Sequence, residues 1–179
     1  MYDFSSFLLC CFARRHSYAV GFVVGSCSVL QAYISRSLRD ELDLEVLALD
    51  WSDVQTEGAA RRDALPQATS VGVGAKGALT YRTLPINKTS LLAATDEWTA
   101  QVSTNTEEQA TCARTLPVLF LALHACGSLT LDILRAFTHQ VKAPAPSWRP
   151  AAALVVGCCY NLLSPEGQFP AEFPDQCSS

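Results

Sequence analysis

The sequence has no Cys-x-x-Cys pair, no cluster of positive charge and few charged residues at all, 17% of the chain. Its 13 lysines and arginines are scattered among 17 acidic residues, which gives a formal net charge of −4. A domain that holds polyanionic RNA by itself usually carries a basic field. The composition therefore disfavours a stand-alone nucleic-acid binder.

The sequence predicts neither a signal peptide nor a membrane span at Met1–Val24. Asp3 is the only charge before the apolar run Leu8–Ala13, whereas a signal peptide carries positive charge there. Arg14, Arg15 and His16 then interrupt any span of about 20 apolar residues. We expect no membrane partner and a cytoplasmic or nuclear protein. With 179 residues and 49% hydrophobic residues, the chain is expected to form one globular domain.

The eight cysteines lack the spacing of a zinc site. Cys10–Cys11 and Cys158–Cys159 are adjacent pairs within apolar runs, so we interpret most cysteines as reduced thiols that pack as small hydrophobes. We expect no metal. A weaker hypothesis is that the chain is a thiol redox or metal-binding protein whose site consists of Cys126, Cys158 and Cys159.

Hydrophobic periodicity predicts alternating helices and strands. Ile34, Leu38 and Leu42 share one face of a helix, after which Leu44–Leu49 is a mostly apolar strand that ends at Asp50. Further elements are expected as a helix at Val54–Ala64, a strand at Leu116–Leu123, a helix at Thr130–His139 and a strand at Ala152–Val156. This succession is typical of an α/β protein with a mostly parallel open sheet.

The organisation expected along the chain is an atypical N-terminal segment at 1–28, a domain at 29–170 and a tail at 171–179. Within the domain, residues 67–115 are expected to be a loop-rich insertion, because they are rich in Ser, Thr, Gly and Ala and weakly periodic. Gly72–Gly77 matches G-x-G-x-x-G by its letters. It follows no convincing strand and opens no convincing helix, so we interpret it as a loop.

Three expected strand ends carry the candidate site, because ligands of an open parallel sheet bind beyond the carboxyl ends of its strands. These ends are Asp50–Trp51, His124–Gly127 and Gly157–Tyr160. A carboxylate such as that of Asp50 can accept hydrogen bonds from both ribose hydroxyls of a nucleoside cofactor. The alternative for Asp50 is a turn or helix-capping residue.

The residues after the Leu116–Leu123 strand have several interpretations. His124 is a base, a ligand, or a polar residue with one hydrogen bond at a strand end, the commonest case for an isolated histidine. Cys126 would be a nucleophile only beside a cation that lowers its pKa. Gly127 permits a positive φ or a close approach of the backbone to a ligand.

Together these segments resemble one family. Leu123–Thr130 has the order H-x-C-G-x-L, and Val156–Leu163 supplies C-C-Y-x-x-L after a helix. Tyr33–Arg36, Val46–Asp50 and Ala59–Arg62 extend the likeness upstream. The chain resembles the methyltransferase-like twenty-five family, which includes proteins labelled as containing a ribosomal RNA adenine dimethylase domain.

The resemblance implies a class I methyltransferase fold, a Rossmann-like three-layer sandwich, with S-adenosylmethionine as the cofactor. It places Asp50, Trp51, His124, Cys126 and Gly127 around the cofactor. It places Cys158, Cys159 and Tyr160 on the acceptor side. It assigns no catalytic base, and the acceptor stays unknown: the family label points to RNA, which the charge of this chain does not support.

The chain also departs from the family. Relatives carry a D-x-G-x-G-x-G loop directly before the Tyr-x-Ser-Arg helix, whereas Ser26, Ser28, Leu30 and Ala32 stand at those positions here. We therefore expect a partial, truncated or mis-spliced methyltransferase domain, in which Ala19–Val24 serves as a makeshift first strand. The alternative is a non-catalytic Rossmann-like remnant or interaction module.

Overall fold

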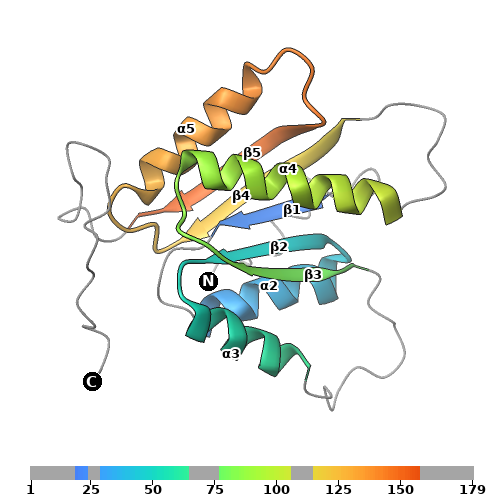
Figure 1. Cartoon of the computed structure of the whole chain (residues 1–179). Helices are drawn as coiled ribbons and strands as arrows, with labels where there is room; N and C mark the ends of the chain where they lie inside the picture. Colours follow the sequence, from blue (N-terminus) through green and yellow to red (C-terminus); the bar gives the residue numbers. More distant parts are fainter. Residues whose placement is uncertain (1–18, 24–28, 65–76, 106–114, 158–179) are drawn as a thin grey trace.

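Five parallel strands form the sheet of the protein, in the order β3-β2-β1-β4-β5 (Figure 1). The structure is a computed structural model that describes residues 19–23, 29–64, 77–105 and 115–157. The strands are β1 (Ala19–Val23), β2 (Glu45–Asp50), β3 (Leu79–Thr83), β4 (Leu116–Leu123) and β5 (Trp148–Val156). The predicted parallel α/β sheet is confirmed.

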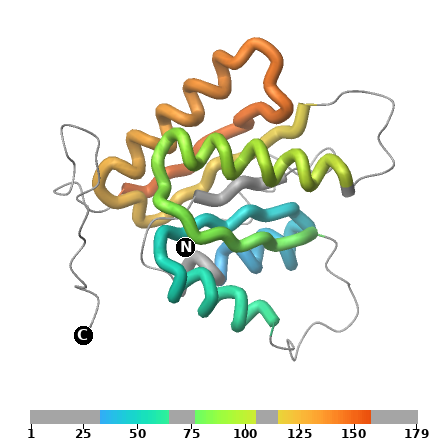
Figure 2. The backbone as a smooth tube through the Cα atoms, in the orientation of Figure 1, coloured from blue at the N-terminus to red at the C-terminus, as the bar shows by residue number. Residues whose placement is uncertain are grey.

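Four helices connect the strands and cover both faces of the sheet, because a parallel pair needs a crossover. They are α2 (Val29–Leu42), α3 (Asp53–Asp63), α4 (Lys88–Asn105) and α5 (Leu129–Val141). Helices α2 and α3 pack on one face, whereas α4 and α5 lie side by side on the other (Figure 2). The three layers are those of a Rossmann-like methyltransferase sandwich.

Strand β1 occupies the centre of the sheet. Its backbone pairs with β2 from Ala19↔Glu45 to Val23↔Leu49, and with β4 at Ala19↔Val118 and Phe22↔Leu121. The expected first strand is thus present and bridges the two halves of the sheet. The rest of the 1–28 segment, at 1–18 and 24–28, lies outside the described residues.

Residues 77–105, which are described, are mostly regular secondary structure, although we expected a loop-rich insertion at 67–115. They contain the edge strand β3 and the 18-residue helix α4, which packs over β1 and β2. Buried threonines explain why the hydrophobic periodicity of α4 is weak in the sequence. Thr95 and Thr99 lie on the inner face of α4, where their hydroxyls donate to the carbonyls of Leu91 (2.7 Å) and Thr95 (2.9 Å). A hydroxyl that is hydrogen-bonded can be buried. A threonine on the inner face of a helix nevertheless interrupts the apolar periodicity by which the helix is recognised in the sequence.

Two clusters of apolar side chains hold the layers together. The larger lies between the sheet and α4/α5, and its most buried members include Phe120, Trp98 and Trp148. The smaller lies under α2 and centres on Leu38, Val46, Leu119 and Leu121. Each large side chain that is fully buried stabilises the fold by roughly 1.5–3 kcal/mol. Among the described helices, none is both long and apolar enough to cross a membrane.

Polar contacts fix α4 and α5 relative to the edge strand β5, and α2 relative to α3. Trp148 of β5 donates from Nε1 to Asp96 Oδ1 of α4 (2.6 Å), and its carbonyl accepts from Gln140 Nε2 of α5 (3.1 Å). On the opposite face, Arg39 Nη1 of α2 contacts Asp63 Oδ1 (2.7 Å) and Oδ2 (2.8 Å) of α3. The Trp148–Asp96 and Arg39–Asp63 contacts join elements that are not consecutive, whereas Gln140 and Trp148 lie on consecutive elements.

Gly77 allows a close approach of two backbones just before β3. A Cβ atom at this position would lie 2.7 Å from the carbonyl carbon of Leu44 and would overlap its oxygen. We predict that Gly77→Ala lowers the free energy of unfolding by about 1–3 kcal/mol, because backbone must shift to make room. Urea denaturation of the whole chain measures this change.

Gly58→Ala is the matched control. A Cβ there would meet only Arg62 Nη2, at 3.8 Å, inside helix α3. This variant should stabilise the protein by about 0.5–1 kcal/mol, as expected for glycine replaced within a helix. Equal effects of the two substitutions would contradict the tight contact at Gly77.

Candidate functional site

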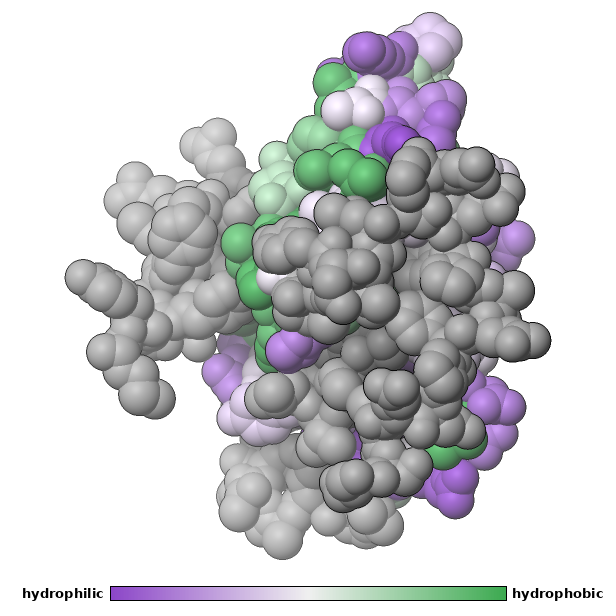
Figure 3. Space-filling view, turned by 90° about the vertical axis from the view of Figure 1, so that its left-hand side faces the viewer, coloured by the Kyte–Doolittle hydropathy of each residue, from purple (hydrophilic) through white to green (hydrophobic). Residues whose placement is uncertain are grey.

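The candidate site lies at the carboxyl edge of the sheet, where the strand order reverses. From β1 the chain passes to β2 and β3 on one side, and later returns to β4 and β5 on the other. Open α/β sheets bind ligands in the crevice at such a reversal. Figure 3 looks onto this edge, at which the strand arrows of Figure 1 end. The upper part of the view, at the height of α5, shows apolar patches among hydrophilic surface, and Leu131 and Leu134 of that helix are exposed.

Asp50 and the loop after β4 flank β1 at this edge. Leu49 pairs with Val23 at the end of β1, so Asp50 lies one residue beyond that pair on one side. On the other side, Phe22 pairs with Leu121, and the chain leaves β4 at Leu123 to enter His124–Gly127. The structure thus brings the first two predicted strand ends to opposite sides of the same strand.

Asp50 is buried (8% exposed) and partly engaged by its own turn. Its Oδ1 accepts a hydrogen bond from the backbone N–H of Ser52 (2.8 Å), and the N–H of Trp51 also donates to the carboxylate. Burial raises the pKa of Asp50 above its ordinary value, while these two N–H groups oppose the rise. The turn interpretation is therefore correct in part. A carboxylate offers about four acceptor positions, so capacity for a ligand remains.

A chain of hydroxyls supports this turn. Thr83, at the end of β3, donates from Oγ1 to Thr56 Oγ1 (2.7 Å), and Thr56 donates to the carbonyl of Ser52 (2.7 Å). The main-chain N–H of Leu84 donates to the Asp50 carbonyl (2.9 Å). These contacts join β3 to the start of α3, and no spacing in the sequence predicts them.

Trp51 follows Asp50 directly and carries an exposed aromatic side chain. It is 51% exposed, and Val54, on the first turn of α3, is 70% exposed. Large exposed apolar residues next to a buried carboxylate suit a ligand with one flat apolar part and one part rich in hydrogen-bond donors. Apart from its position shortly after Asp50, nothing in the sequence indicated that Val54 would belong to this surface.

The loop after β4 has two left-handed residues, His124 (φ 58°) and Gly127 (φ 57°). Glycine adopts this conformation at little cost, whereas a residue with a Cβ pays roughly 1–2 kcal/mol. Such strain persists where surrounding contacts enforce it, and it is enriched at functional sites. His124 and Cys126 are both partly exposed, and Ala125 between them is buried. Of the two interpretations of Gly127, the positive φ is present in the structure, and the close approach to a ligand stays a prediction.

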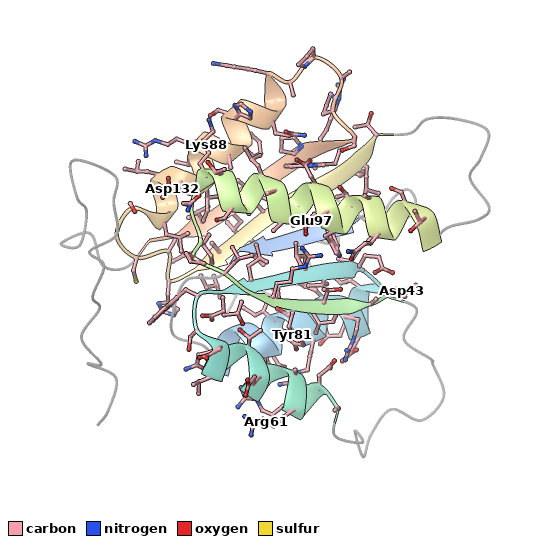
Figure 4. All side chains as sticks on the ribbon, viewed as in Figure 1. Asp43, Arg61, Tyr81, Lys88, Glu97 and Asp132 are labelled. Atoms are coloured by element: carbon pink, nitrogen blue, oxygen red, sulfur yellow. The ribbon has the colours of Figure 1, made fainter. Side chains whose placement is uncertain are left out.

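Asp132 is a buried acidic residue at the same edge of the sheet, and it belongs to none of the motifs described above. It lies on α5, and its carboxylate accepts a hydrogen bond from the backbone N–H of Lys88, the first residue of α4 (Figure 4). Burial raises the pKa of Asp132, and Arg135, whose Nη1 lies 3.6 Å from Asp132 Oδ1, opposes the rise. Asp132 thus joins the start of α4 to α5 beside the His124–Gly127 loop.

Some of the predicted residues cannot be placed. Cys158, Cys159 and Tyr160 follow Gly157 directly but lie outside the described residues, as do Ser26 and Ser28 of the degraded glycine loop. Their predicted roles stay predictions. Within the described ranges, no three His, Cys, Asp or Glu side chains gather into a group that could hold a metal ion.

The family of the chain follows from comparison with known proteins. A family model described as a methyltransferase domain matches residues 24–166. The chain is also 38% identical over 61 residues to a mouse (Mus musculus) protein named probable methyltransferase-like protein 25. That stretch is 34% of this chain and 9% of the mouse protein, so the chain spans a small part of the length of this relative. No solved structure matches the chain at a significant level. These matches confirm the resemblance that the H-x-C-G-x-L motif predicted, and the chain belongs to the methyltransferase domain family.

Proposed function

We propose that this domain binds S-adenosylmethionine at the carboxyl edge of its sheet and transfers the methyl group to an acceptor. The observation that carries the proposal is the convergence of Asp50–Trp51 and His124–Gly127 on either side of β1. The family supplies the reaction class. The described residues supply a partner for the nucleoside part of the cofactor.

The residues at this edge fit a nucleoside. Asp50 keeps acceptor capacity beyond the two N–H groups of its turn, and vicinal ribose hydroxyls are two convergent donors. Trp51 offers an exposed aromatic surface on which a purine can stack. Gly127, with its positive φ and no side chain, allows the backbone of the second loop to approach the ligand closely. His124 and Cys126 then border the same space.

The proposed chemistry relies on positioning. When bound, the cofactor supplies an electrophilic methyl group on a sulfonium. The protein's task is to orient the cofactor and to hold the acceptor in line with that methyl group, because an aligned near-attack geometry accounts for a large part of the barrier reduction. Asp50 and Ala125, on the two sides of β1, are both buried, which limits their movement.

Calorimetric titration of the whole chain with S-adenosylmethionine tests the proposal. We expect saturable binding that S-adenosylhomocysteine displaces competitively, because both share the nucleoside. A folded protein that binds neither compound would refute the proposal and favour the alternative of a non-catalytic interaction module.

Replacement of Asp50 should weaken cofactor binding. We predict that Asp50→Ala costs roughly 1–3 kcal/mol of binding free energy, the scale of hydrogen bonds to a charged group. Glu57→Ala is the control, because Glu57 is an exposed residue on α3 that pairs with Arg61 at 3.2 Å. Unchanged affinity in a folded Asp50→Ala protein would remove Asp50 from the site.

The affinity should also depend on pH through Asp50. Protonation removes acceptor capacity from the carboxyl group, so cofactor affinity should fall as the pH falls through the pKa of Asp50. Since burial raises this pKa, the loss should begin at a higher pH than for an ordinary aspartate. Asp50→Asn should flatten the profile. A profile of the same shape in this variant would assign the titration to another group.

Fluorescence gives an independent check on Trp51. The chain has three tryptophans, of which Trp98 (2% exposed) and Trp148 (0%) are buried, so quenching by acrylamide reports mainly on Trp51. We expect bound S-adenosylmethionine to protect Trp51 from the quencher, and Trp51→Phe to abolish that protection. Protection that persists in Trp51→Phe would show that the cofactor lies elsewhere.

A further inference from the structure

Thr130 makes a contact that differs from those of three other threonines in α4 and α5. Thr95, Thr99 and Thr138 each donate to a carbonyl four residues earlier, within their own helix. Thr130 lies in the first turn of α5 and instead donates from Oγ1 to the carbonyl of Ala125 (3.0 Å), five residues earlier and outside the helix. Its hydroxyl therefore bonds to the loop that follows β4 and not to its own helix.

Ala125 is the fixed point of that loop. Its N–H donates to the carbonyl of Val156 at the end of β5 (2.9 Å), and its carbonyl accepts from Thr130. The residue is 3% exposed and belongs to the larger apolar cluster. Both polar groups of a buried peptide must find partners, so the two contacts together hold Ala125 between β5 and α5.

The neighbours of Ala125 are the two side chains that the proposed site uses. His124 precedes it in the left-handed conformation, and Cys126 follows it with its N–H donating to the His124 carbonyl (2.8 Å). Because Ala125 is held in place, the backbone of its two neighbours, His124 and Cys126, is constrained as well. If the Thr130 contact is lost, a buried carbonyl loses its partner, and the loop can relax only by moving His124 and Cys126.

We propose that Thr130 is a positioning residue of the cofactor site, which acts through Ala125 to hold His124 and Cys126 in place. The inference rests on the proposed function for the identity of the ligand, but the placement of the loop can be tested without any ligand. The Ser128 side chain makes no capping hydrogen bond to α5, so the hydroxyl of Thr130 is the side-chain link from the first residues of this helix to Ala125.

Three variants of the whole chain separate positioning from general stability. Thr130→Val keeps the shape and removes the hydroxyl, whereas Thr130→Ser keeps the hydroxyl. Thr138→Val removes a hydroxyl from the same helix, where Thr138 donates to Leu134 (2.9 Å) at an exposed site. Thr130→Ala serves as a second hydroxyl-free variant if Thr130→Val does not fold, as judged by circular dichroism.

Two measurements are made on each variant. In calorimetry with S-adenosylmethionine, Thr130→Val should raise the dissociation constant by roughly three- to tenfold, as expected for one lost hydrogen bond. Thr130→Ser and Thr138→Val should remain within about twofold of the wild type, inside the usual effect of a neutral surface change. In NMR spectra, the His124 imidazole resonances should shift in Thr130→Val and return in Thr130→Ser. In the Thr130 variants, the exposed His139 on α5 should stay unchanged as an internal control.

Unshifted His124 resonances in Thr130→Val would overturn the proposal, as would an affinity loss of the same size in Thr138→Val. A wild-type protein that binds no cofactor would instead refute the proposed function. In that case the His124 spectra still decide whether Thr130 holds the loop, because they need no ligand.

Discussion

The pairing of β1 with both β2 and β4 is the constraint on which the rest of the structure depends. Without this strand, the β2–β3 pair and the β4–β5 pair would be separate two-stranded sheets, each with an open edge. With it, every crossover helix has a continuous surface to cover, α2 and α3 on one face and α4 and α5 on the other. The strand order reverses at β1, and the candidate residues follow the strands on its two sides.

The sequence predicted the parts of the fold in which burial and residue type agree. The apolar run at Leu116–Leu123 is the buried strand β4, and the alternation of helices and strands correctly indicated a parallel sheet. It failed where polar residues are buried. Helix α4 places Thr95 and Thr99 against the sheet with their hydroxyls satisfied by its own carbonyls, so its inner face does not look apolar in the sequence. Strand β3, at the edge, is half-buried and equally inconspicuous.

For the candidate site, the sequence predicted which residues end the strands, and the register shows that two of these ends flank β1. It could not show how the ends are held. The support of Asp50 comes from Thr83, Thr56 and Ser52, and that of the second loop from Thr130 and the end of β5. Thr83 meets Thr56, and Ala125 meets Val156, only in the folded chain, whereas the Thr56–Ser52 and Thr130–Ala125 contacts are local. Polar residue types alone give no indication of such partners.

The central position of β1 has a kinetic consequence. Ala19 pairs with Glu45 after one short helical crossover, but its pairing with Val118 must bring together residues separated by most of the chain. Closing so long a loop costs entropy before any contact is gained, and proteins dominated by such distant pairings fold slowly. The β1–β2–β3 half can therefore assemble early, and β4 joins it late. The proposed site has residues on both sides of β1, so it would be complete only once β1 and β4 have paired. A ligand bound there would stabilise the paired state of these two strands.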